Sequence, residues 1–281
     1  MEQFPRTTVG GVSLPRLIAG SNWFLGYSHT SLAKDKFIKQ HQTRDRIAEV
    51  LTAFLENGID AVMGPPSELL EAATRDAEQK CGVKMVRIIT PEFNVRPGGD
   101  PESEPAKMLD TCRSLEATFC LPHQAVTDAL IDRMTGRIRD LDRYTRMIRE
   151  RGMIPGLSTH MPEGVIYADR HNEDVETYLQ IYNADGFLMQ VEADWVMRVI
   201  HRAKKPVMTI KPLAAGRLLP LVGLSFVWST IRAQDMVVIG TTTPDEVREV
   251  VDISLDLLQK QLPGVELQKT RSKRSLEIDN P

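Results

Sequence analysis

The sequence predicts a single (β/α)8 barrel, and three observations lead to that fold. Eight short apolar runs rich in Val, Ile and Met recur along the 281 residues, and each is followed by a longer segment with helical periodicity. Such alternation is typical of a parallel sheet, and eight is the strand number of the closed α/β barrel. No Pro/Gly-rich linker divides the chain, so we expect one barrel domain over residues 1–265 and a charged C-terminal tail over residues 266–281.

The expected strands are the apolar runs themselves. In chain order they are Arg16–Gly20, Ile59–Met63, Met85–Thr90, Ala117–Leu121, Ile154–Ser158, Gly186–Val191, Val207–Ile210 and Met236–Gly240. An open doubly wound sheet has the same alternation of strands and helices, and the strand count alone does not exclude that alternative.

Two of the expected helices have clear amphipathic patterns. In Thr43–Asn57 the apolar side chains share one stripe and Gly58 follows, which is typical of a helix that packs on a sheet and ends at glycine. Pro244–Leu258 begins with proline after Thr243 and has acidic residues in its first turn, so it is expected to be the last barrel helix. The remaining helices are expected at Ser67–Gln79, Ala106–Leu115, Leu130–Arg151, Ala193–Ala203 and Leu221–Arg232.

Two connections are longer than a barrel needs. Arg96–Pro105 is the nearest candidate for a linker, but a loop from a strand to a helix explains it more simply. Tyr167–Asn183 also exceeds a plain connection. Long loops of this kind often serve as lids, so either segment is a candidate lid over the barrel mouth.

The charge of the chain argues against a polyanionic partner. The formal net charge is −3, so no global positive field is available to hold nucleic acid by counterion release. The longest basic cluster, Lys269–Arg274, fits a solvated terminus better than a binding arm. We therefore expect a small-molecule substrate or ligand and no nucleic acid.

Cysteine usage and the lack of long apolar stretches predict the compartment. Cys81, Cys112 and Cys120 are an odd number without short paired spacing, which argues against a disulfide framework and against a zinc or iron–sulfur site. The N-terminus has no apolar signal core, and no stretch approaches the roughly 18 apolar residues of a membrane span. We expect a cytoplasmic protein that contacts no membrane. The sequence does not decide its oligomeric state.

Small and polar residues follow the last four expected strands, at the end of a barrel where chemistry takes place. In order, the chain reads GLSTH, QVEADW, IKPLAAGR and VVIGTTTPDEV. Over Gly152–Leu258 this ordered set resembles the second half of an aldo-keto reductase. The resemblance implies a (β/α)8 barrel and an oxidoreductase that uses NAD(P)H.

The resemblance also implies which residues hold the nicotinamide dinucleotide. In that family a Ser of the fifth strand and a Gln of the sixth hold the nicotinamide carboxamide, and Ser158 and Gln190 stand in those places. The loops after the seventh and eighth strands bind the phosphates and ribose. Here they supply Lys211, Leu213, Gly216, Thr241 and Thr242.

The loop after the eighth strand allows two interpretations. Hydroxyls and backbone amides at a helix N-terminus suit a phosphate, but GTTTPDEV also reads as a Thr cap in front of a helix that begins with proline.

Two departures from the family bear on the cofactor. Thr159 replaces the Asn that usually follows the Ser, and Glu246 stands where many relatives have an Arg for the 2′-phosphate. A carboxylate at that place repels the phosphate and disfavours NADP.

The first half of the chain lacks most of the groups that the family uses for reduction. The resemblance implies a Tyr proton donor, a Lys that lowers its pKa, an Asp paired with this Lys, and a His that orients the substrate. Met63 stands at the Asp position without a Tyr nearby, and Pro91 and Glu92 follow the third strand where the Lys belongs. Lys84 precedes that strand and is expected at the opposite end of the barrel. Only His123, after the fourth strand, matches the pattern.

Two residues after the first strand are candidate substitutes for the missing donor. Tyr27 and His29 lie in the segment SNWFLGYSH, at the end of the barrel where chemistry is expected. The alternative is structural, with the aromatic side chains of this loop covering the barrel mouth. With His123 to orient the substrate and Tyr27 or His29 to donate a proton, the sequence predicts an oxidoreductase with an altered catalytic centre.

Two other functions fit the same barrel. One is a metal-dependent lyase, isomerase or hydrolase, because several rim residues are of types that bind divalent transition metals. These residues are His29, Glu92, His123, His160 and Glu192. No local ligand spacing supports that site, and we predict no metal. The other is a non-catalytic ligand-binding barrel, for which loss of the catalytic residues is natural evidence.

Overall fold

The computed structural model describes residues 4–95, 103–261 and 263–264. Its main sheet is parallel and has the strand order β10-β11-β12-β13-β3-β4-β5-β6-β9. The bounds are β3 (Leu17–Gly20), β4 (Ala61–Gly64), β5 (Val86–Ile89), β6 (Phe119–Cys120), β9 (Ile154–Pro155), β10 (Leu157–Thr159), β11 (Tyr178–Ile181), β12 (Val207–Ile210) and β13 (Met236–Gly240).

The two ends of this sheet meet at Gly156, so the sheet is a barrel. β9 pairs with β6, and β10 pairs with β11, so these two short strands are the halves of one barrel strand on either side of Gly156. A Cβ atom at Gly156 would lie 2.7 Å from Leu121 Cγ and 2.9 Å from Thr177 Cγ2. Glycine is therefore required where the three neighbouring strands crowd together. Counted this way the barrel has eight strands, and the predicted fold is confirmed.

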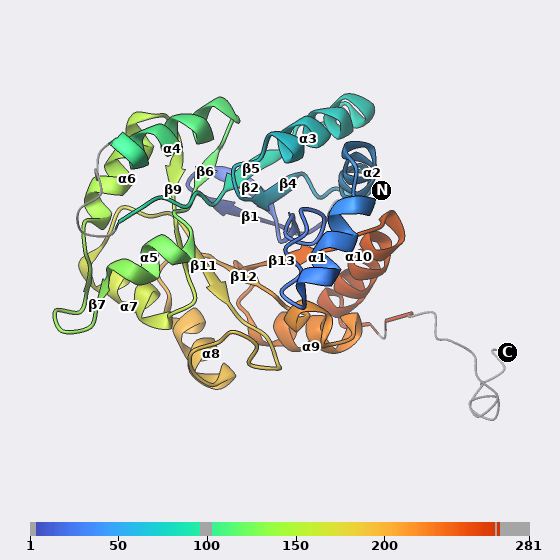
Figure 1. Ribbon diagram of the computed structural model, residues 1–281. Helices are drawn as coiled ribbons and strands as arrows, with labels where there is room; N and C mark the ends of the chain where they lie inside the picture. Colours follow the sequence, from blue (N-terminus) through green and yellow to red (C-terminus); the bar gives the residue numbers. More distant parts are fainter. Residues whose placement is uncertain (1–3, 96–102, 262, 265–281) are drawn as a thin grey trace, which may run out of the picture.

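The helices lie outside the ring of strands (Figure 1). They are α1 (Leu32–His41), α2 (Arg44–Glu56), α3 (Glu68–Cys81), α4 (Ser103–Ser114), α5 (Gln124–Leu130), α6 (Leu141–Glu150), α7 (Pro162–His171), α8 (Ala193–Arg202), α9 (Pro220–Thr230) and α10 (Pro244–Leu258), with a short 3-10 helix at Ala214–Gly216. The predicted caps of the clearest two are present, because the side chains of Thr43 and Thr243 accept hydrogen bonds from the amides of Arg46 and Glu246. No helix in the described part of the chain is both long and apolar enough to span a membrane.

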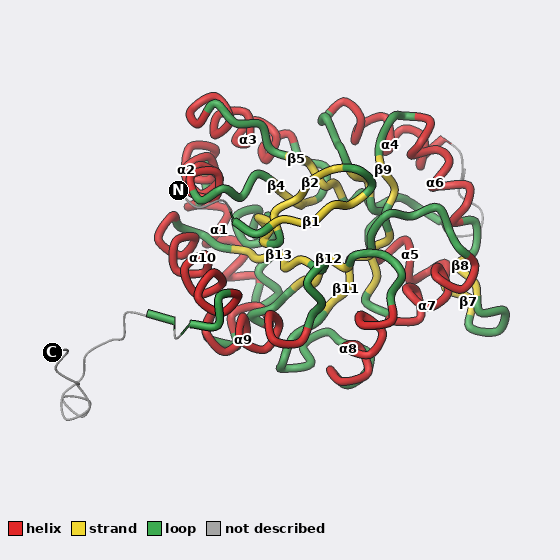
Figure 2. Tube along the Cα trace, turned by 180° about the vertical axis from the view of Figure 1, so that it is seen from behind, coloured by secondary structure: helices red, strands yellow, loops and turns green. Residues whose placement is uncertain are grey.

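The core has two layers. Inside the barrel a cluster of buried side chains from alternate strand positions includes Ile18, Met63, Phe119, Leu179 and Met208. A larger cluster fills the space between the strands and the helices. The antiparallel hairpin of β1 (Arg6–Val9) and β2 (Val12–Pro15) crosses the back of the barrel (Figure 2) and adds Val9 and Leu14 to the inner cluster. The hairpin thus covers one end, and the mouth is at the other.

The predicted sixth strand, Gly186–Val191, is wrong. The strand in that place is β11, and Gly186–Val191 lies in the loop before α8. Gly186 and Leu188 have φ values of +70° and +56°, which an extended strand cannot contain. Asn183 holds the loop, because its side chain donates to the carbonyl of Phe187 (3.1 Å) and accepts from the amide of Phe187 (2.8 Å). The apolar run is largely exposed, with Leu188 at 44% and Val191 at 38%.

Two further predictions about segments need correction, and others concern residues outside the described part of the chain. The expected helix Leu130–Arg151 is interrupted by a small hairpin, β7 (Ile131–Asp132) and β8 (Arg137–Ile138), and only α6 follows it. The candidate lid Tyr167–Asn183 instead contains the end of α7 and all of β11. In the other candidate lid, residues 96–102 lie outside the described residues, as do the predicted tail 266–281 and its basic cluster Lys269–Arg274.

Candidate active site

A cavity of about 700 Å³ opens at the carboxyl ends of the barrel strands. Each of the eight barrel strands contributes to its wall, either from the strand itself or from the loop that follows. One lining residue for each strand, in order, is Gly20, Met63, Thr90, His123, Ser158, Leu179, Lys211 and Gly240. The cavity also receives side chains from α1, a helix in the loop after β3 that the sequence analysis did not predict. Active sites of this fold form at this end.

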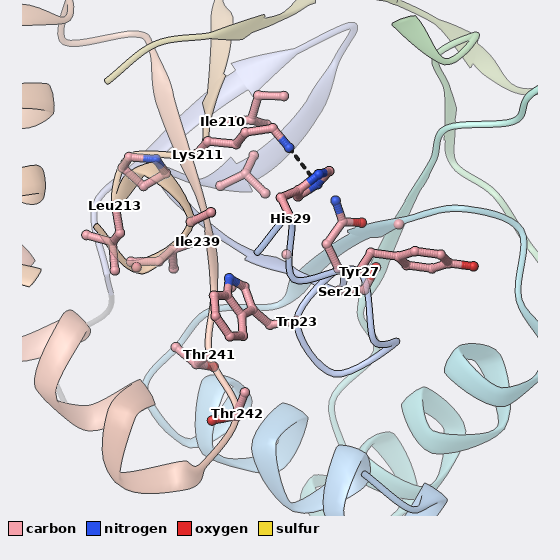
Figure 3. A pocket seen from close by; sticks show the side chains of 18 of the residues that line it. Ser21, Trp23, Tyr27, His29, Ile210, Lys211, Leu213, Ile239, Thr241 and Thr242 are labelled. Atoms are coloured by element: carbon pink, nitrogen blue, oxygen red, sulfur yellow. Dashed lines mark hydrogen bonds between the residues drawn. The ribbon is translucent and has the colours of Figure 1, made fainter. Parts of the chain in front are cut away.

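His29 and Lys211 meet across the mouth of the cavity. Lys211 Nζ lies 2.9 Å from His29 Nε2, and Figure 3 shows the two side chains pointing toward one another. Lys211 follows β12, and His29 belongs to the loop after β3, so the contact joins the first and seventh barrel loops. A charged lysine has no acceptor. It therefore donates to Nε2, and the proton of neutral His29 is on Nδ1.

Burial lowers the pKa values of this cluster. Burial brings the pKa of Lys211 down to about 8, so the amine is mostly protonated at neutral pH with a substantial neutral fraction. Burial, and then the charge of Lys211, lower the pKa of His29. Burial followed by Lys211 takes the pKa of His160 to about 4, so His160 is neutral. Burial also lowers the pKa of His123, although Glu92 opposes that shift.

Two hydroxyl groups near the eighth strand differ in their hydrogen bonding. Thr241 lines the cavity, and its Oγ1 is buried with no hydrogen-bond partner among the described residues. The next residue, Thr242, is fully engaged, because Glu246 Oε2 accepts from its amide at 2.5 Å and from its hydroxyl at 2.8 Å. A buried hydroxyl without a partner is suited to a ligand, whereas the amide of Thr242 is already occupied by a carboxylate.

Trp23 covers the end of the eighth strand. A Cβ atom at Gly240 would lie 2.7 Å from Trp23 Cδ1, and one at Gly216 would lie 3.7 Å from Trp23 Cζ2. Figure 3 shows the indole close to Thr241. Gly240 is therefore needed for the indole to reach this position. The ring brings a large flat apolar surface to the loops that the resemblance assigns to a dinucleotide.

The structure brings most of the predicted site residues together. Nine of the ten line the cavity: Tyr27, His29, His123, Ser158, Lys211, Leu213, Gly216, Thr241 and Thr242. Their placement differs in detail. Tyr27 is 49% exposed, and its ring points away from the His29–Lys211 pair toward Lys39, whose Nζ lies 5.2 Å from the ring centre. The Tyr27 hydroxyl is thus poorly placed to serve a ligand held at that pair.

Gln190 is the exception, and its placement corrects the sequence analysis. Gln190 is exposed in the loop before α8 and does not line the cavity, because the strand that was expected to present it does not form. The glutamine on the sixth barrel strand is Gln180 of β11, which is fully buried. Its Nε2 donates to the carbonyl of Ile181 at 3.3 Å, and its neighbour Leu179 faces the cavity instead.

The second and third strands end without charged groups in the cavity wall. Met63 and Thr90 line the cavity where β4 and β5 end. Lys84 lies before β5, at the other end of the strand, and its Nζ binds Glu78 Oε2 at 3.0 Å. Among the residues described, no group of three or more His, Cys, Asp and Glu side chains is arranged to hold a metal ion. This includes the rim residues considered above, although His123 Nδ1 lies 3.8 Å from Glu92 Oε2.

Some of the cavity residues carried no usable sequence signal. Lys211 was expected among phosphate-binding residues, and nothing in the sequence indicated its contact with His29, which is 182 positions away. His160 was noted only as a rim residue. The segment SHTSLAKD, which contains the start of α1, has Ser31 as a cap whose side chain accepts from the amide of Lys34. That cap was the one available signal for the helix.

Comparison with known proteins places this fold beside the aldo-keto reductases. No family model matches the sequence, and no curated protein matches it significantly. Among solved structures, the “putative aldo-keto reductase” PA4992 of Pseudomonas aeruginosa has a TM-score of 0.65 at 15% identity, covering 92% of this chain and 98% of that one. An aldo/keto reductase from Brucella melitensis has a TM-score of 0.59 at 14% identity, covering 94% and 95%. An aldose reductase from Giardia lamblia has 0.52 at 13%, covering 98% and 92%. The predicted resemblance is thus confirmed at the level of the fold.

Proposed function

We propose that this protein is an oxidoreductase of the aldo-keto reductase type that binds NADH and reduces a small carbonyl compound. The observation that carries the proposal is one cavity that joins Ser158, the loops after the seventh and eighth strands, and the His29–Lys211 pair. Carbonyl reduction needs a dinucleotide next to a proton donor. The cavity offers side chains for both tasks.

The cavity wall fits a dinucleotide that lacks a 2′-phosphate. Ser158, Leu213, Gly216 and Thr241 would hold it, and the free Oγ1 of Thr241 is available to a ligand hydroxyl. Thr242 would not bind a phosphate, because Glu246 already takes its amide and hydroxyl and would repel an added negative charge. NADH therefore fits better than NADPH.

The bound dinucleotide supplies the two electrons of the reduction, and the side chains of this chain supply the proton and the orientation. His123 would orient the carbonyl oxygen. The His29–Lys211 pair would donate the proton, because it holds one at neutral pH and faces the cavity. In this proposal Met63 and Thr90 stand where the family has charged residues, and the proton donor comes from the first and seventh loops instead. Tyr27 is not used, because its ring points away.

The proposed dinucleotide site predicts that one of two substitutions weakens NADH binding and that the other does not. Ser158→Ala should weaken NADH binding by about fivefold to tenfold, which corresponds to one lost hydrogen bond of about 1 kcal/mol. Gln190→Ala should leave the affinity unchanged, because Gln190 is exposed outside the cavity. Titration with NADH, followed by calorimetry and by intrinsic tryptophan fluorescence, to which Trp23 in the cavity wall contributes, measures both. Absence of binding by the unmodified protein at millimolar NADH rejects the proposed function.

The contact between Glu246 and Thr242 predicts the choice between the two dinucleotides. Glu246→Gln keeps a hydrogen-bond acceptor but removes the charge, so it should raise the affinity for NADPH by about tenfold with little effect on NADH. The matched control is Asp245→Asn, because Asp245 is the neighbouring carboxylate, binds Arg248 at 2.7 Å and does not line the cavity. Competition titrations with both dinucleotides give the ratio of the affinity for NADPH to the affinity for NADH. An equal gain in NADPH affinity in both variants would show that the effect comes from removal of any nearby negative charge and not from the contact between Glu246 and Thr242.

We also propose that the protein works in the cytoplasm. Cys81, Cys112 and Cys120 are free thiols, which supports a reducing compartment.

A further inference from the structure

We propose that Lys211 is also a nucleophile that condenses reversibly with an aldehyde or ketone in this cavity and forms an imine. This inference goes beyond the proposed reductase, because the condensation needs no dinucleotide. It concerns the same class of ligand, a carbonyl compound, and rests on the surroundings of the Lys211 amine.

Lys211 is partly buried in the cavity wall, and its amine has no counter-ion among the described residues. His29 Nε2 is its hydrogen-bond partner, and no ion pair among the described residues includes Lys211. Buried lysines are normally paired with a carboxylate. A lysine that is removed from water and left unpaired loses its proton more easily, and this is how lysines that form Schiff bases are activated. The pKa of about 8 that burial gives Lys211 agrees with this role.

Apolar side chains form part of the wall of the cavity, which leaves room for a ligand. Leu179, Ile210 and Val238 line the same cavity as Lys211, and Leu179 and Val238 are almost completely buried. Apolar walls disfavour the ammonium form and exclude water from an imine, which water would otherwise hydrolyse. The cavity of about 700 Å³ is large enough for a small carbonyl compound beside the amine.

The backbone at Lys211 has an unusual conformation. Lys211, Ala214 and Ala215 have φ values of +60°, +47° and +57°. Side chains other than glycine rarely adopt this left-handed region, and such residues gather at functional sites where the fold maintains the strain. At Lys211 this conformation turns the side chain from the end of β12 toward His29 (Figure 3).

The nearby histidines can carry out the proton transfers of the condensation. The neutral amine attacks the carbonyl carbon, and a C–N bond forms as the C=O π bond breaks. The nitrogen gives up a proton and the oxygen receives one, which yields a carbinolamine. Loss of that oxygen as water, with a second proton, leaves the C=N bond of the imine. His29 lies within hydrogen-bond distance of the amine, and His123 and His160 are close enough to Lys211 to feel its charge. No oxidant or reductant is needed.

Reductive trapping tests the proposal on the full chain. The protein is incubated with butanal and a limiting amount of cyanoborohydride, without dinucleotide, and the alkylated lysines are identified by peptide mass spectrometry. Lys205 is the internal comparator, because it precedes β12 while Lys211 follows it, and it does not line the cavity. At about pH 7, Lys211 should be alkylated about tenfold faster than Lys205, because burial enlarges the neutral fraction of the Lys211 amine and this outweighs its lower intrinsic nucleophilicity.

Two variants and the pH dependence complete the test. Lys205→Arg should leave trapping at Lys211 unchanged, whereas His29→Gln should slow it severalfold while circular dichroism shows a folded barrel. The rate at Lys211 should rise with pH and level off near the pKa of about 8. Equal rates at the two lysines, or a Lys211 rate that continues to rise to about pH 10, would overturn the proposal. Trapping uses no NADH, so its result tests the role of Lys211 as a nucleophile independently of the dinucleotide titrations.

Discussion

Replacing Arg87 by methionine should lower the free energy of unfolding by about 3–5 kcal/mol, because two buried carboxylates then lose their shared counter-ion. Arg87 lies on β5, and Glu71 and Glu78 lie on α3. The three side chains are 6%, 9% and 5% exposed. Arg87 donates to both carboxylates and to the carbonyl of Met85. This cluster fixes α3 on the barrel.

Arg75 provides the matched control for Arg87. Its Nε also donates to Glu71 Oε1, at 2.7 Å, but its side chain is 53% exposed. Solvent screens an exposed pair, so Arg75→Ala should cost less than about 1 kcal/mol. Urea unfolding followed by circular dichroism gives both values. If Arg87→Met costs no more than Arg75→Ala, the buried cluster contributes little to stability.

The contribution of this cluster to the stability of the fold depends on pH. Burial alone would raise the pKa of Glu78, but the hydrogen bonds from Arg87, from the amide of Met85 and from Lys84 outweigh it, and the pKa lies below its ordinary value. A carboxyl group with a lowered pKa in the folded state stabilises the fold above its unfolded pKa. That contribution is lost as the pH falls through the folded pKa. Arg87→Met should therefore remove part of the acid sensitivity as well as the stability.

His29→Asn should lower the turnover of a carbonyl substrate with NADH by about 10² or more, because a positioned proton donor typically contributes 10² to 10⁴ to the rate. Asparagine keeps a polar side chain but cannot relay the proton of Lys211. Tyr27→Phe should stay within about twofold of the unmodified protein, since the Tyr27 ring points away from the pair. NADH oxidation with a panel of small aldehydes measures both. A larger loss in Tyr27→Phe than in His29→Asn would assign the proton donor to Tyr27.

The pH profile separates the two roles given to Lys211. As proton source for reduction, Lys211 must be protonated, so kcat/KM should fall about tenfold per pH unit above the pKa of about 8. As a nucleophile it must be neutral, so trapping with butanal should rise over the range below that pKa. The two rates thus change in opposite directions with pH. A reductase rate that stays level through this range would remove Lys211 from the proton transfer.

The site shows where sequence reasoning succeeded and where it did not. Ser158, His123 and the loops after the seventh and eighth strands were found because each directly follows an apolar run, and the carboxyl ends of parallel strands meet at one rim. Gln190 was misplaced because Gly186–Val191 is more apolar than Tyr178–Ile181, the segment that forms β11. Local hydrophobicity does not distinguish a buried strand from an apolar loop.

The sequence by itself determined the alternation of strands and helices, the barrel class, and local features such as the Thr243 cap with Pro244 that begins α10. These depend on residues close together in the chain, so propensity and periodicity reveal them. Only the tertiary structure decided which segment became the sixth strand, because parallel pairing with β10 and β12 on both sides selects it. The tertiary structure alone also brought His29 to Lys211, because closure of the barrel places the first and seventh loops side by side, and no local pattern encodes that contact.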